Sequence, residues 1–152
     1  MRRAILSARA VVDVSAEQAR EWFLSLREHP ERYQFDTHEG FEFVEGDFGE
    51  VGARFKTREK FFLLKLELLF VLTEVGESGF GFGLARPGSI QVWGRFDIDR
   101  EGEGRSVVFL AVGSETRFGQ LLLRCFPVAT AVHRQIRREV EHIKASMERM
   151  YA

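Results

Sequence analysis

The last third of the chain carries a long apolar stripe at helical spacing. From Phe118 to Ala152, apolar side chains recur at steps of three and four residues, which keeps them on one face of a helix. The opposite face is charged, so this helix must pack its stripe against another element. The sequence therefore predicts one long amphipathic helix with the following stripe: Phe118, Leu122, Cys125, Phe126, Ala129, Val132, Ile136, Val140, Ile143 and Met147.

The region before this helix consists of strand-like segments separated by glycine-bearing turns. Short connections of this kind join antiparallel neighbours. The predicted fold is therefore α+β, with a seven-stranded antiparallel sheet wrapped around the long C-terminal helix. The predicted strands are Ile5–Val14, Phe41–Glu45, Ala53–Phe61, Leu66–Val75, Gly79–Ala85, Gln91–Asp99 and Arg105–Ser114.

Two short helices are expected after the first strand. Ser15 and Gln18 have the spacing of a capping box, and the helix that they start should run to about Arg27. The pair His29-Pro30 should end it, because the residue before a proline disfavours helical backbone. A second short helix is expected over residues 30–33, followed by a loop from Phe35 to Gly40.

One face of the sheet should be exposed and the other covered. The basic side chains of the Ala53–Phe61 strand alternate with apolar ones, which places the basic side chains on the exposed face. Trp93 is also expected on the exposed face, where it could mark a dimer contact. We expect a monomer or a weak homodimer.

Composition excludes several classes of function. The 152 residues are expected to form a single domain, residues 1–152, with 22 basic and 23 acidic side chains and a net charge of −1. This balance argues against nucleic acid as a partner. The most apolar segment, Phe61–Leu72, is short and contains Lys65 and Glu67, so no integral membrane segment is expected.

The predicted location is cytoplasmic. The apolar run that follows Met1-Arg2-Arg3 is interrupted by Arg9 and Asp13, too early for a signal peptide. Cys125 is the only cysteine, so no intramolecular disulfide can form, which fits a reducing compartment.

The order of elements resembles the START/Bet v 1-like (SRPBCC, polyketide cyclase/lipid-transfer) superfamily, whose fold is the helix-grip fold. Local segments agree with the resemblance: Val12–Glu17 at the first strand-to-helix junction, Trp22 in the first helix, Gly49–Phe55 before the third strand, and Pro127 with residues 134–144 in the closing helix. The resemblance implies a cavity between sheet and C-terminal helix that binds a hydrophobic or amphipathic small molecule, such as a lipid, an isoprenoid or a polyketide-like aromatic.

Candidate ligand-binding residues follow from the predicted faces. Glu59 shares a strand face with Phe55, and His133 lies close to the centre of the helical stripe. If buried, Glu59 would have a raised pKa and His133 a lowered one, and the pair could anchor a ligand hydroxyl or act as acid and base. Alternatively, Glu59 lies at a solvated strand end and His133 at the edge of the stripe. The predicted lining residues are Phe35, Phe55, Glu59, Phe70, Phe82, Phe96, Phe126, His133 and Ile136.

No catalytic residue, metal site or cofactor is predicted. The four histidines, His29, His38, His133 and His142, lack the paired spacing of a zinc helix, and Cys125 is better explained as a core residue than as a nucleophile. Gly79, Gly81 and Gly83 do not fit a phosphate-binding loop and are interpreted as clearing one face of a strand, where they could also widen the cavity.

Two alternatives to a non-catalytic binder remain open. The first is a polyketide cyclase or dehydratase, for which the nominated polar groups are Glu59, His133, Thr57 and Ser106. The second is an interaction protein that resembles the coenzyme Q-binding or ribosome-associated branch of the superfamily. It would present a contiguous exposed patch in place of a large cavity.

Overall fold

A computed structural model describes residues 3–61, 63–86 and 88–152, and confirms the predicted helix-grip fold. All neighbouring strands of the seven-stranded sheet are antiparallel, in the order β1-β7-β6-β5-β4-β3-β2. The strands are β1 (Leu6–Val12), β2 (His38–Glu45), β3 (Arg54–Phe61), β4 (Leu64–Val75), β5 (Gly79–Leu84), β6 (Val92–Gly102) and β7 (Arg105–Ser114). The helices are α1 (Ala16–Leu24), the 3-10 helices η1 (Ser25–Arg27) and η2 (Pro30–Tyr33), α2 (Arg117–Arg124) and α3 (Val128–Met150).

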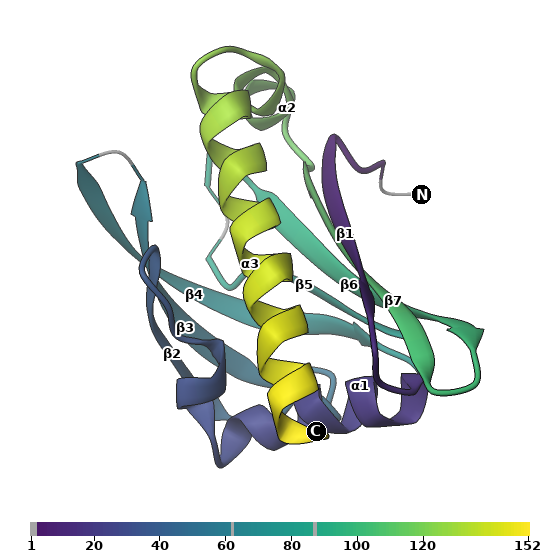
Figure 1. The fold of residues 1–152 in the computed structure, drawn as a ribbon. Coiled ribbons are helices and arrows are strands. Elements are labelled where there is room, and N and C mark those ends of the chain that lie inside the picture. The colour runs from purple at the N-terminus through teal and green to yellow at the C-terminus, as the bar shows by residue number, and fades with distance from the viewer. Residues whose placement is uncertain (1–2, 62, 87) are drawn as a thin grey trace.

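The sheet curls around α3, which crosses its concave side, while α1 lies at the C-terminal end of the helix (Figure 1). The second half of α3 buries the predicted stripe, with Ile136, Val140, Ile143 and Met147 all less than 4% exposed. The indole Nε1 of Trp22 in α1 donates a hydrogen bond to Ser146 Oγ at 2.9 Å, which ties the two helices together. The end of the fold near α1 is therefore a filled core.

The capping box that starts α1 is present as predicted. Ser15 Oγ accepts from the Gln18 backbone N–H at 3.1 Å, and the Gln18 side-chain oxygen accepts from the Ser15 backbone N–H at 3.0 Å. The alternation of β3 is also confirmed, since Phe55, Thr57 and Glu59 are buried while the basic residues between them are not.

The prediction of one continuous C-terminal helix is wrong. The chain forms α2, then the link 125–127, then α3. Pro127 cannot donate a backbone hydrogen bond, and its ring disfavours helical backbone at Phe126. Phe126 is consequently 84% exposed, and Cys125, predicted in the core, is exposed as well.

The loop predicted from Phe35 to Gly40 is also wrong in its second half. β2 begins at His38, which pairs with Glu59 of β3. The polar residues and the glycine of this segment are typical of a loop. In the structure, however, their backbone groups find hydrogen-bonding partners along the edge of β3. This pairing places His38 next to Glu59 on the concave side.

Trp93, predicted to be exposed, is only 6% exposed. Its ring lies over Gly113 of the neighbouring strand β7, where even one added methyl group would collide with the indole. The missing side chain at Gly113 therefore provides the space in which Trp93 is buried.

The glycines of β5 clear the outer face of the sheet. Phe80 is fully buried and Phe82 lines the interior cavity described below, as their predicted face requires. Above Gly81, Arg95 Nη1 reaches from β6 across β5 to Glu74 Oε2 of β4 at 2.7 Å. A side chain at Gly81 would crowd Glu74, so this glycine makes room for an ion pair on the outer face and does not widen the cavity.

None of the helices within residues 3–61, 63–86 and 88–152 is long and apolar enough to span a membrane. The predicted turn at residues 87–89 and the Met1-Arg2-Arg3 segment fall partly outside the described residues.

Candidate functional site

A cavity of about 510 Å³ lies between the concave face of the sheet and α3. Its walls are almost entirely apolar and come mainly from strands β2 to β7 and from both C-terminal helices. Two of the lining residues are exposed, Leu64 at the start of β4 and Ile90 in the β5–β6 connection, so the cavity opens to solvent beside these two residues.

Six of the nine predicted lining residues are brought together in this cavity: Phe55, Glu59, Phe70, Phe82, Phe96 and Ile136. Phe35, Phe126 and His133 do not line it. Phe35 stacks on the imidazole rings of His38 and His142, with centroid distances of 5.6 and 4.7 Å. His133 is exposed on the flank of α3, because the stripe used to place it included residues before Pro127 that do not belong to the same helix.

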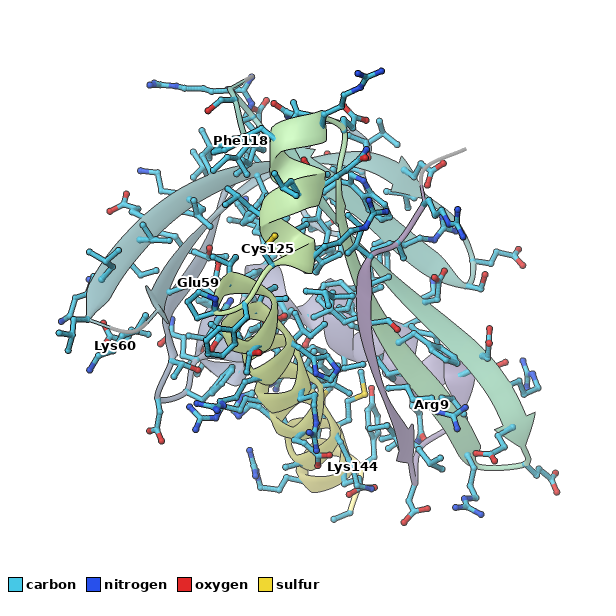
Figure 2. The ribbon with its side chains drawn as sticks, turned by 90° about the horizontal axis from the view of Figure 1, so that it is seen from above. Arg9, Glu59, Lys60, Phe118, Cys125 and Lys144 are labelled. Carbon is cyan, nitrogen blue, oxygen red and sulfur yellow. The ribbon has the colours of Figure 1, made fainter. Side chains whose placement is uncertain are left out.

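A polar cluster lines the cavity where β2, β3 and α3 approach one another. It consists of His38, Glu59 and Glu139, whose exposed fractions are 2%, 9% and 7%. One ligand-capable atom from each of the three lies within 4.8 Å of the other two. Figure 2 shows Glu59 beside α3, whereas the neighbouring Lys60 lies at the outer edge of the molecule. Because side chains alternate along β3, the Glu59 carboxyl group points inward, whereas the neighbouring basic residues Arg58 and Lys60 face solvent.

Each member of the cluster is oriented by a further hydrogen bond. The Tyr33 hydroxyl donates to Glu139 Oε1 at 2.9 Å, and the Thr57 hydroxyl donates to Glu59 Oε2 at 2.9 Å. His38 Nδ1 lies 2.6 Å from the Tyr33 carbonyl oxygen. Because a carbonyl can only accept, Nδ1 carries the proton and the lone pair of the neutral ring is on Nε2. Nε2 faces Glu139 Oε1 at 3.5 Å.

Burial governs the protonation of the cluster. It raises the pKa of Glu59 to about 7, against the bond from Thr57, and it lowers the pKa of His38 to about 4. The pKa of Glu139 is raised well above its usual range by burial and then by the charge of Glu59. At neutral pH His38 is therefore uncharged, so its contact with Glu139 is not an ion pair.

Sequence reasoning misses two members of this cluster. His38 falls in a segment predicted as a loop, and only its pairing with Glu59 reveals its position. Glu139 does carry a signal, because it follows Ile136 by three residues and precedes Val140, which places it on the apolar stripe. Ser106, nominated for an enzyme, is fully buried away from the cavity and donates to the Val14 carbonyl oxygen at 3.0 Å.

Neither a protein-family model nor a curated protein matches the sequence. Solved structures do match. TTHA0849 from Thermus thermophilus has a TM-score of 0.77 at 15% identity, over 97% of this chain and 99% of that chain. The Zhui aromatase/cyclase from Streptomyces sp. R1128 has a TM-score of 0.74 at 11% identity, over 99% of this chain and 96% of that chain.

A START superfamily protein from Mycobacterium smegmatis has a TM-score of 0.63 at 14% identity, over 97% of each chain. Identities this low establish a shared fold and carry no ligand from one protein to another. The order of elements, the curled sheet and these neighbours agree, and the chain has the helix-grip fold of the START/Bet v 1-like (SRPBCC) superfamily.

Proposed function

We propose that the protein binds a hydrophobic or amphipathic small molecule in the cavity between the sheet and α3. The observation that carries the proposal is the cavity itself, which has about 510 Å³ of space within apolar walls. This volume falls within the roughly 300–1,000 Å³ of typical small-molecule sites. A core that served stability alone would be packed without such a void.

The chemistry of the walls favours a ligand with an apolar body and a single polar end. The rings of Phe55, Phe70 and Phe82 offer contact surface without hydrogen bonds. The cluster of His38, Glu59 and Glu139 offers donors and acceptors in one place. A purely apolar ligand would displace water from these groups without giving them new hydrogen bonds, which would weaken its binding. A lipid, an isoprenoid or a polyketide-like aromatic with a hydroxyl or carbonyl group fits this pattern.

A fluorescence titration tests the proposal. N-phenyl-1-naphthylamine is neutral and emits strongly only in apolar surroundings, so it should bind with a stoichiometry of one and be displaced by the natural ligand. Ile136→Trp fills the cavity and should abolish the signal, whereas Val44→Trp adds the same ring at an exposed position of β2 and should leave it unchanged. Equal binding by both folded variants would refute the proposal. Native mass spectrometry of the protein from its own host would identify the class of ligand.

The proposal includes a cytoplasmic location and a monomer or weak homodimer. The exposed thiol of Cys125 supports a reducing compartment, since such a thiol is oxidised readily elsewhere. Size-exclusion chromatography with light scattering measures the oligomeric state directly.

A cyclase or dehydratase is the second candidate function. The geometry that favours it is the convergence of two carboxyl groups and an imidazole on the cavity, which is the arrangement needed to move a proton to and from a carbonyl compound. Glu59→Gln keeps the shape of the side chain, so a catalytic role predicts lost turnover of a polyketide substrate with retained binding. Retained turnover would exclude Glu59 as an acid or base.

A further inference from the structure

We propose that His38, Glu59 and Glu139 form a binding site for one divalent transition-metal ion, such as Zn²⁺, at the polar end of the cavity. The three side chains come from β2, β3 and α3, and one ligand-capable atom from each lies within 4.8 Å of the other two. One imidazole nitrogen and two carboxylate oxygens form a donor set that Zn²⁺ and neighbouring first-row ions accept.

The orientation of each side chain suits a ligand of a metal ion. The Tyr33 carbonyl oxygen holds the proton of His38 on Nδ1, which leaves the Nε2 lone pair aimed into the cluster. The hydroxyl groups of Thr57 and Tyr33 orient the Glu59 and Glu139 carboxyl groups. Hydrogen bonds of this kind from outside the donor set orient the ligands in known metal sites.

The contacts within the cluster leave a place for a cation. His38 Nε2 lies 3.5 Å from Glu139 Oε1, which is longer than a good hydrogen bond, and the side chain that carries this nitrogen is only 2% exposed. A divalent ion would neutralise the negative charges of two carboxylates, and the neutral imidazole adds no further charge. The bound ion would therefore remove the cost of placing two like charges in an apolar cavity.

The surroundings favour an open coordination position. All three residues line the cavity, so a fourth position on the ion would face the space in which the ligand is proposed to bind. Three protein ligands with an open position are typical of reactive zinc sites. Among residues 3–61, 63–86 and 88–152, this is the only group of three such side chains that could hold an ion.

The test is a titration of chelator-treated protein with Co²⁺, whose visible absorption reports coordination by nitrogen and oxygen ligands. We expect one equivalent to bind and Zn²⁺ to displace it. Glu139→Gln, Glu59→Gln and His38→Gln should each weaken binding by at least about 100-fold, and loss of the outer hydroxyl in Tyr33→Phe should weaken it by about 10-fold.

Two exposed residues on α3 provide matched controls. His133→Gln and Glu141→Gln remove the same kinds of ligand atoms outside the cavity and should leave the affinity for Co²⁺ unchanged. Far-UV circular dichroism checks that each variant is folded, and the two isosteric Glu→Gln variants decide the result if His38→Gln is not. Absence of stoichiometric binding, or unchanged affinity in the folded Glu→Gln variants, would overturn the proposal. Because dye binding requires no metal, this result is independent of the cavity test.

Discussion

Two phenylalanines that differ in their surroundings provide a direct test of whether the cavity is real space. Phe23 is fully buried, and its ring centroid lies 4.8 to 5.6 Å from those of Trp22, Phe48, Phe80 and Phe96. Phe23→Ala would leave a closed void that neighbouring rings cannot fill. It should therefore cost about 4 kcal/mol of unfolding free energy, within the range for deletion of a buried aromatic ring.

Phe82 makes comparable ring contacts, at 5.3 to 5.5 Å from Phe55, Phe70 and Phe96, but it also faces the cavity. Since the cavity opens to solvent, water can occupy the space that Phe82→Ala creates. The variant therefore loses only the free energy gained by burying the ring, without the penalty for an empty void, which predicts a cost of about 2 kcal/mol of unfolding free energy.

Urea denaturation of the two variants measures this difference of about 2 kcal/mol between the predicted costs. Phe126→Ala is the matched control, because its ring is 84% exposed and its loss should change the unfolding free energy by no more than about 0.5 kcal/mol. Equal costs for Phe23→Ala and Phe82→Ala would mean that Phe82 lies in an ordinary filled core, and the reasoning that leads from cavity to ligand would fail.

Three further predictions concern other parts of the structure. Ser15→Ala removes the capping hydrogen bond of α1 and should lower the unfolding free energy by about 1 kcal/mol in a urea titration, with no change in dye binding. Gly113→Val should displace the indole of Trp93 and shift its fluorescence to longer wavelength, whereas Gly102→Ala, at an open site, should not; equal spectra would refute the packing described. In metal-free protein, Glu59→Gln should raise the melting temperature more at pH 8 than at pH 5. The pKa of Glu59 in the folded state is raised to about 7, above its value in the unfolded chain. Ionisation of Glu59 therefore favours the unfolded chain more and more as the pH rises between these two pKa values. An equal gain in melting temperature at both pH values would contradict the raised pKa.

The parts of the fold that are predictable from the sequence depend on local patterns. The alternation of β3 identifies its buried face, and the spacing of Ser15 and Gln18 identifies the start of α1. The C-terminal stripe identifies α3 because its residues lie within a few turns of one another. The break before α3 could also be predicted from the sequence, because a proline in the middle of a helical pattern interrupts the helix that the apolar spacing suggests.

The candidate site is harder to predict because it depends on contacts between distant segments. Glu59 is found from the pattern of its own strand. His38 belongs to the cluster only through its pairing with Glu59, and the short polar segment that contains it has no periodicity of its own. His133 and not Glu139 is predicted as a cavity residue because the apolar residues of α2 and α3 are treated as one helix. This shifts the apparent centre of the apolar stripe towards His133.

The strand order has a consequence for how the protein is made. β1 pairs with β7, and Leu6 lies opposite Val112, so during synthesis β1 is complete before its partner strand, which follows roughly a hundred residues later. At about 5 to 20 residues per second, that delay is about 5 to 20 seconds. During this time β1 has neither its partner strand nor α3, which packs against it. Nascent chains are therefore expected to be most vulnerable to aggregation before β7 emerges, and to need protection of β1 by a chaperone.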